Sequence, residues 1–299
     1  MPFTFISKLL NSSSLQYIQA IGWFILSLLI SCCNDALTKY LSYTLHAWEI
    51  TFLRFGLGII TLLPLLLYNG VSAFRTTRWG LHLCRGALLF VAISLWAEGL
   101  KTSPITTATV MSFSVPLFVL LLSPLLLKER VSGLLWLLTV GGFMGIVLVL
   151  QPSIAAFNPG SWFFLLAVLL FALLDILNKK YVAQESILSM LFYSSIVACI
   201  CTTYPAIQVW QMPSSLQWVA LWMLGIGGNL ILYFLLRAFS LSNASSLTPF
   251  RYLELLISML VSYFFFHELP TISGYLGAAV VIPCTLLVGY LQTRKVSNL

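Results

Sequence analysis

Ten apolar stretches, each about as long as a membrane-spanning helix, divide almost the whole chain between them. A helix that crosses a bilayer needs about 20 consecutive apolar residues. Only 8% of the residues are charged, whereas a soluble domain has about 25%. No soluble core would hide this much apolar surface, so lipid must surround most of the chain. The sequence therefore predicts an all-α integral membrane protein with ten transmembrane helices, near residues 18–39, 47–68, 79–100, 104–127, 133–151, 160–180, 187–209, 216–238, 247–266 and 273–292.

The connections between these predicted spans are short, as in KTSP at 101–104 and HELPTI at 267–272. They leave no room for a soluble catalytic domain, so we do not expect an enzyme. The six cysteines fall inside the spans without the paired spacing of a zinc site, and the three histidines are scattered. We therefore expect no metal and no cofactor.

Basic residues are concentrated on one side of the predicted membrane. With ten spans both termini lie on the same side, and most Lys and Arg residues of the connections lie there too. The opposite side has only Lys39 and Lys101. Excess Lys and Arg marks the cytoplasmic face. We predict that both termini are cytoplasmic and interpret the net charge of +7 as an insertion signal, with no nucleic-acid partner.

The end of the first span has a counterpart at the end of the sixth. Asp35-x-x-x-Lys39 and Asp175-x-x-x-Lys179 match at an offset of 140 residues. With a shift of one residue the match continues through the pairs Ser103 and Ser242, and Glu129 and Glu268. Two halves of five spans each enter the membrane in opposite directions, an inverted repeat that is typical of secondary transporters. The predicted organisation is an N-terminal segment 1–17, repeats at 18–151 and 160–292, and a C-terminal tail 293–299.

Charged side chains inside the spans point to a polar interior, because a charge at the bilayer centre costs about 2.5–3.5 kcal/mol. The repeat places Asp35 in the outer half of the membrane and Asp175 in the inner half. Arg54 lies at about the depth of Asp35 in the adjoining span, so we expect these two to form an ion pair. The alternative is that each Asp and Lys pair only anchors a helix end, with the lysine reaching the interface.

The ninth span has the largest polar face. Arg251 and Glu254 are three residues apart and share a face, with Tyr252 alongside. A guanidinium and a carboxylate on one buried face favour a zwitterionic ligand, because Arg binds a carboxylate with two parallel hydrogen bonds. The alternative is an intrahelical Arg–Glu pair that only neutralises itself.

Two other spans carry candidate binding residues. In the third span Arg85 and Trp96 lie along one face, and in the fourth Ser112 and Phe113 belong to a polar stripe beside Pro116. Pro116 removes a backbone donor and is expected to bend the helix. The alternatives are an arginine and a tryptophan placed at the interfaces, and hydroxyls that only join neighbouring helices.

The motifs resemble a known family. Ten spans in two halves, D-x-x-x-K at the ends of spans one and six, and Lys-Glu or His-Glu after spans four and nine are similar to the drug/metabolite transporter superfamily of the EamA type. More narrowly, SxxNDxxxKYL, WExxFxRF, LDIxNKK, ISMLFYS and PxRYLELxIS resemble the S-adenosylmethionine transporters of obligate intracellular bacteria.

The resemblance implies a multi-pass protein of the bacterial inner membrane that imports S-adenosylmethionine by alternating access, with S-adenosylhomocysteine as the exchange partner. Arg251 would bind the carboxylate, and Glu254 or Asp175 the cationic groups. The expected substrate-binding set is Arg251, Glu254, Tyr252, Asp175, Trp96, Phe113, Ser112, Arg85, Tyr193 and Asn178. The expected gating or structural ion pairs involve Asp35, Asn34, Lys39, Arg54 and Lys179, with Asp175 pairing to Lys179 or Arg251 on the inner side.

Several alternatives stay open from the residues alone. An amino-acid or other metabolite exporter of the same architecture has the same general pattern. Proton coupling through the buried acids would replace exchange. An intramembrane two-aspartate protease is disfavoured because Asp35 and Asp175 lie toward opposite faces. A non-transporting scaffold could use Gly141-x-x-x-Gly145 for helix packing, but it does not need a buried Arg–Glu set.

Overall fold

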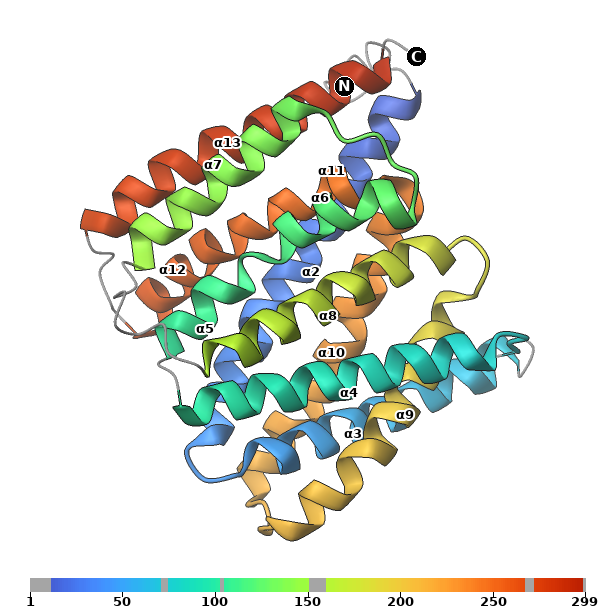
Figure 1. Ribbon diagram of the computed structural model, residues 1–299. Coiled ribbons are helices and arrows are strands. Elements are labelled where there is room, and N and C mark those ends of the chain that lie inside the picture. The colour runs from blue at the N-terminus through green and yellow to red at the C-terminus, as the bar shows by residue number, and fades with distance from the viewer. Residues whose placement is uncertain (1–11, 71–74, 103–104, 151–159, 267–271, 298–299) are drawn as a thin grey trace, which may run out of the picture.

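A computed structural model describes residues 12–70, 75–102, 105–150, 160–266 and 272–297, and all regular elements in these ranges are helical (Figure 1). The elements are α2 (Ser12–Ser42), α3 (Ala47–Asn69), α4 (Trp79–Thr102), α5 (Ile105–Ser112), α6 (Val115–Leu126), α7 (Gly133–Leu150), α8 (Ser161–Tyr181), α9 (Ile187–Gln208), α10 (Ser215–Leu241), α11 (Ala244–Leu247), the 3₁₀ helix η3 (Thr248–Tyr252), α12 (Leu253–Phe266) and α13 (Ile272–Ser297).

Nine segments in the described part of the chain are helical, long and apolar enough to cross a membrane. They correspond to nine of the ten expected spans. The expected span 247–266 does not reach that length as one helix, because the chain divides it into α11, η3 and the 14 residues of α12. An all-α membrane protein is therefore confirmed, and the count of ten spans stays a prediction.

The fourth span is also broken, at a place that matches the break in the ninth. The fourth span is not continuous, since it divides into α5 and α6 around Phe113 and Ser114. The ninth divides at η3, which ends at Tyr252, the counterpart of Phe113 at an offset of 139 residues. A proline stands near the start of each second piece, Pro116 in α6 and Pro249 in η3. Proline has no amide hydrogen to donate and is best tolerated in the first turn of a helix, so it favours the start of a new helical piece at these places.

The terminal boundaries differ from those expected. Helix α2 begins at Ser12, inside the predicted N-terminal segment 1–17, and α13 continues to Ser297, inside the predicted tail 293–299. Polar residues such as Gln, Lys and Arg are good helix formers. The edge of an apolar run therefore marks the expected edge of the hydrocarbon, and the helix continues beyond it.

The contacts between helices repeat with the roles of the two halves exchanged. Helix α2 packs on α10 as α8 packs on α4, α3 packs on α10 as α9 packs on α4, and α12 packs on α2 as α6 packs on α8. Two further pairs, α3 with α9 and α7 with α13, join equivalent helices of the two halves. This pattern is that of a pseudo-two-fold axis, which must pass between the members of those two pairs.

Small residues allow the close approach of α7 and α13, which lie side by side in Figure 1. A Cβ atom added to Gly277 of α13 would lie 2.7 Å from the backbone oxygen of Gly145, and one added to Gly145 would lie 3.2 Å from that of Gly277. Gly141, by contrast, faces the thiol of Cys284. The expected small-residue packing therefore occurs, at an interface between the two halves.

Candidate functional site

A buried ion pair joins the ninth and sixth spans. Nη2 of Arg251, in η3, donates a hydrogen bond to Oδ2 of Asp175, in α8, over 2.9 Å. The two side chains are only 20% and 7% exposed. Arg251 forms no ion pair with Glu254 in the described residues, because its side chain reaches α8 instead. The guanidinium of Arg251, which was expected to bind a ligand's carboxylate, therefore binds the carboxylate of Asp175 instead.

Asp175 was expected to pair with either Lys179 or Arg251, and Lys179 does not form this pair. Its Nζ donates to the backbone oxygens of Phe239 and Ser242, each over 2.7 Å. These oxygens lie at the C-terminal end of α10, where intrahelical donors run out. A cation there also interacts favourably with the helix dipole, so Lys179 closes the end of α10.

Two carboxyl groups from opposite halves lie near each other, where α2 contacts α12. Asp35 of α2 is exposed, and its charge interacts with those of Glu254 in α12 and Arg54 in α3. The side chain of Glu254 forms a hydrogen bond with Ser31 of α2. Cys32 donates to the backbone oxygen of Glu254 over 3.7 Å. The charge of Arg251 acts on Glu254, but neither acid forms an ion pair with a cation of the described residues, so together they favour a cationic guest.

The expected ion pair between Asp35 and Arg54 is absent from the described residues. Arg54 points toward α10 instead, where its Nε would lie 3.1 Å from a Cβ added to Gly228. That Nε is buried and has no hydrogen-bond partner. The charges of the two residues interact all the same, so their pairing stays a prediction. Helix α3 itself packs chiefly on α9 and α10.

A small cavity of about 50 Å³ opens beside this guanidinium. Its wall comes from α3, α4, α9 and α10, and thus from both halves. Asn229 is held in the wall by hydrogen bonds from Nδ2 to the oxygen of Gly58 at 2.7 Å and to Oγ1 of Thr61 at 2.9 Å. The lining residues are Arg54, Phe55, Gly58, Leu89, Ser194, Ser195, Gly225, Gly228, Asn229 and Leu232.

Arg85 and Asn178, both expected to bind substrate, bind each other between the halves. Nε and Nη2 of Arg85 donate to Oδ1 of Asn178 over 3.0 and 2.7 Å, and Nη1 donates to the oxygen of Met190 over 3.0 Å. Arg85 is only 2% exposed. Its donors are thus used to join α4 to α8 and α9.

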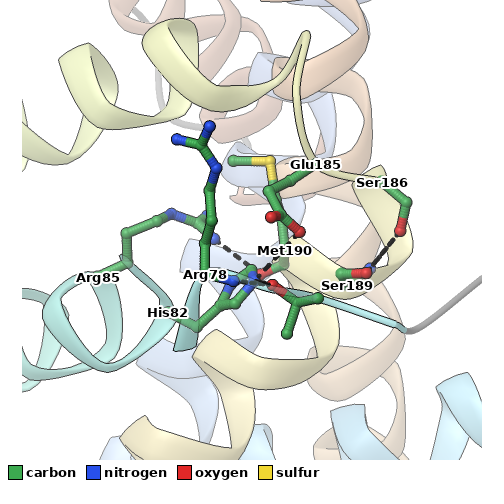
Figure 2. A network of polar contacts seen from close by, with 8 residues as sticks. Arg78, His82, Arg85, Glu185, Ser186, Ser189 and Met190 are labelled. Carbon is green, nitrogen blue, oxygen red and sulfur yellow. Dashed lines mark hydrogen bonds and ion pairs between the residues drawn. The ribbon is translucent and has the colours of Figure 1, made fainter. Parts of the chain in front are cut away.

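A second polar group adjoins Arg85, where the chain enters α4 and passes from α8 to α9 (Figure 2). Nε2 of His82 lies 3.1 Å from Oγ1 of Thr76 and 3.5 Å from Oε2 of Glu185. Arg78 lies over the ring of Tyr181 at 5.3 Å. Figure 2 shows His82, Arg85 and Glu185 converging on this connection, which makes it a firm contact between the halves.

The four candidate aromatic residues do not gather at one place. Phe113 and Tyr252 are 6% and 1% exposed and belong to one apolar cluster, with Tyr252 against Gly142. Trp96 packs on Phe164 at a centroid distance of 4.9 Å, which makes it part of the core between α4 and α8. Tyr193 contacts Trp79 and His82 beside the polar group of Figure 2. Stacking on Phe113 or Tyr252 would require these cores to open.

The other candidates have local roles. Ser112 donates to the oxygen of Thr109 over 2.7 Å, within its own helix. Asn34 is buried, donates to the oxygen of Leu224 over 3.4 Å, and packs against Gly227, where any Cβ would collide with it. The side chain of Lys39 lies outside the described residues. No group of three His, Cys, Asp or Glu side chains suited to a metal occurs in the described residues.

Sequence reasoning noticed Glu129 only as part of the repeat. Its carboxylate accepts hydrogen bonds from the amides of Ala244 and Ser245, over 3.1 and 3.0 Å, and from the hydroxyl of Ser245. Glu129 follows α6 in the first half, and α11 begins the broken span of the second half. A carboxylate at a helix N-terminus is stabilised by free amides. Its counterpart Glu268 lies outside the described residues.

The sequence pattern of one protein family, described as the EamA-like transporter family, matches the chain twice, at residues 18–151 and 158–290. A crystal structure of a protein superimposes with a TM-score of 0.78 at 18% identity, covering 96% of this chain and 99% of that one. At such identity the likeness concerns the fold alone.

Curated relatives are similar over nearly the whole chain. The S-adenosylmethionine uptake transporter of Rickettsia conorii is 45% identical over 289 residues, which cover 97% of this chain and 98% of the relative. That of Rickettsia bellii is 43% identical, covering 97% and 99%. The riboflavin transporter of Vibrio cholerae is 26% identical, covering 93% and 95%.

Proposed function

The chain belongs to the EamA-like transporter family, and on that premise we propose that this multi-pass membrane protein carries S-adenosylmethionine into a bacterial cell in exchange for S-adenosylhomocysteine. Transport is its activity, and no enzymatic step is needed. Support for the substrate comes from relatives of that name at up to 45% identity over 97% of the chain.

The observation that carries the proposal is the pair of acids, Asp35 and Glu254, which lie near each other from opposite halves. Neither forms an ion pair with a cation of the described residues, although the charges of Arg54 and Arg251 act on them. S-adenosylmethionine has a sulfonium and an ammonium group, both cationic. Two carboxylates that lie close together repel each other, and the two cationic groups of the guest offset that repulsion. Arg54 lies close enough for its charge to interact with that of Asp35, and it supplies a positive charge for the carboxylate of the same ligand.

Alternating access follows from the exchange of roles between the halves. In the described conformation, Arg85 with Asn178 and Glu129 with Ser245 join the halves on the side where both termini lie. Asp35 and Arg54 are not joined. We assign this conformation to a carrier closed on the terminal side, which opens there when one half rocks against the other around the central acids.

The proposal includes the orientation of the chain in the membrane. Ten spans, with α11, η3 and α12 together forming the ninth, place both termini in the cytoplasm, as the excess of Lys and Arg on that side favours. The repeats at 18–151 and 160–292 then have opposite directions in the membrane. The ion pair of Arg251 with Asp175 belongs to the inner side and acts as a gate.

Uptake of radiolabelled S-adenosylmethionine into proteoliposomes tests the proposal. Vesicles loaded with S-adenosylhomocysteine should accumulate label several times faster than empty vesicles, because the loaded carrier returns with its acids and Arg54 compensated. Unlabelled S-adenosylmethionine should compete and methionine should not. Label that enters equally with or without internal substrate would contradict exchange, and inhibition by methionine alone would favour an amino-acid carrier.

A further inference from the structure

The cavity beside Arg54 lies on the pseudo-two-fold axis. Helices α3 and α9, which the axis relates, supply most of its polar wall. Six of its lining residues are three pairs of equivalent positions, at offsets of 140, 140 and 139 residues: Arg54 with Ser194, Phe55 with Ser195, and Leu89 with Gly228. A point on the axis keeps the same surroundings when the halves exchange roles. A group held there stays in contact with the carrier throughout the cycle.

The wall of this cavity has polar atoms that the described protein does not satisfy. Nε of Arg54 and Oγ of Ser194 are both buried without a hydrogen-bond partner, and Ser194 is only 4% exposed. Unpaired buried donors are rare in folded proteins and indicate a missing partner. A guanidinium and a hydroxyl side by side are suited to an anion such as a carboxylate, which only accepts hydrogen bonds.

The glycine at position 228 gives the guanidinium its place. A Cβ there would lie 3.1 Å from Nε and 3.4 Å from Nη2 of Arg54. Asn229, fixed by its two donated hydrogen bonds, uses both amide hydrogens on α3 and so keeps its remaining group, the amide oxygen, for other contacts. The absence of a side chain at Gly228 thus leaves room for the guanidinium, and no acid forms an ion pair with it within the described chain.

The size of the cavity restricts what it can hold. A water molecule needs about 10–15 Å³ of such space, so about 50 Å³ holds roughly three or four waters. A carboxylate has three heavy atoms and fits, whereas a nucleoside ring system does not, since pockets for drug-sized ligands measure about 300–1,000 Å³. The rest of a ligand must extend away from this point, and the charge of Asp35 lies within reach of Arg54.

We infer that Arg54 and Ser194 form the subsite for the α-carboxylate of the transported amino-acid moiety, on the axis between the halves. The ammonium and sulfonium groups then lie toward Asp35 and Glu254. This inference rests on the proposed function and moves the carboxylate from Arg251, which is paired with Asp175. Arg54 acts as a specificity-determining residue: it selects ligands that keep their carboxylate.

The test compares S-adenosylmethionine with decarboxylated S-adenosylmethionine, which lacks only the carboxylate, in binding to the purified full-length protein. The parent protein should bind the carboxylated compound about 10- to 100-fold more tightly, as expected of a buried charge-assisted contact. Arg54→Gln should lower affinity for S-adenosylmethionine by a similar factor and leave that for the decarboxylated compound almost unchanged. Ser194→Ala should cause a smaller loss in the same direction.

Two further variants keep the outcome interpretable. Gly228→Ala crowds the guanidinium without removing it, because the new Cβ would lie 3.1 Å from Nε, so the same preference should fall by a smaller factor even if Arg54→Gln does not fold. Arg237→Gln removes an exposed cation of α10 and should keep the full preference. If the parent protein binds S-adenosylmethionine but Arg54→Gln or Gly228→Ala keeps its preference, the subsite is wrong. If the parent protein binds neither compound, the proposed function itself fails.

Discussion

The charged residues within the spans are of two kinds: those with a protein partner, and those that form no ion pair within the described residues. Arg251 and Arg85 have protein partners at 2.9 Å or less at their closest contacts. Asp35, Glu254 and Arg54 form no ion pair within the described residues. A carrier must bind and release its ligand, so its binding charges have to be incomplete alone, whereas its structural charges can be fully paired.

Glu254→Gln should distinguish the two proposed ligands. S-adenosylmethionine has a cationic sulfonium, whereas S-adenosylhomocysteine has a neutral thioether at the same place. Removing one acid weakens attraction to the sulfonium, so affinity for S-adenosylmethionine should fall by about tenfold, equivalent to about 1.4 kcal/mol, and that for S-adenosylhomocysteine by less. Calorimetric titration of both ligands measures this. Equal losses for both would argue against contact between Glu254 and the sulfonium.

The pair of Arg251 with Asp175 should be strongly coupled. Arg251→Met leaves a carboxylate that is 7% exposed without its partner, which is expected to destabilise the protein by about 2–4 kcal/mol. Asp175→Asn should cost less when Arg251 is already replaced, with a coupling of about 1–3 kcal/mol. Thermal unfolding of the two single variants and the double variant in detergent gives this value. Additive losses would mean that the pair contributes no interaction of its own.

The sequence identified most of the charged residues of the candidate site, but it did not reveal which residues they contact. Charges within apolar runs identify Asp35, Asp175, Arg251 and Glu254 from sequence alone, because such charges are costly in lipid. Which of them meet depends on how helices from distant parts of the chain cross. Arg54 was expected to face Asp35 because their spans are consecutive, yet it faces Gly228 of α10.

At the scale of helices, the short α11 depends on a residue from the other half. Four residues cannot form a stable helix alone, since nucleation is unfavourable. Glu129 compensates by accepting the amides of Ala244 and Ser245. Lys179 donates hydrogen bonds to the backbone oxygens at the end of α10, which precedes α11 in the chain. From the sequence, a bend was expected only at Pro116, and no local pattern revealed that Glu129 supplies the cap.

Glu129→Ala should therefore destabilise the start of the ninth span. It removes a charged acceptor from two amides and a hydroxyl, for an expected loss of about 1–3 kcal/mol. Arg130→Gln is the matched control, because Arg130 is the exposed neighbour. The melting temperature in detergent should fall by several degrees for Glu129→Ala and stay within about a degree for the control. Equal behaviour of the two variants would remove the capping role.

At the scale of the whole molecule, the pseudo-two-fold axis relates the two halves only approximately, and the differences matter. Arg54 corresponds to Ser194, so one half supplies the cation of the central cavity. Asp35 corresponds to Asp175, yet within the described residues Asp175 forms an ion pair with an arginine and Asp35 does not. Under the proposed alternating access, this unequal chemistry would let ion pairs close one side while the other is open.

The contact of Glu129 with Ser245 offers a test of the rocking motion. It joins the first half to the second on the side of the termini, so the halves can open there only if this contact separates. In a cysteine-free background, Glu129→Cys and Ser245→Cys together should be joined by a short bifunctional thiol reagent. Joining them should reduce uptake of S-adenosylmethionine into proteoliposomes at least tenfold while ligand binding from the opposite side persists.

Each single-cysteine variant treated with the same reagent provides the control and should transport as before treatment, because one attached group does not tie the halves together. A reagent with a cleavable disulfide in its linker should allow reductant to restore uptake. Uptake that continued at the untreated rate in the cross-linked double variant would show that the halves need not part at this contact, and that the carrier does not open on the side of its termini.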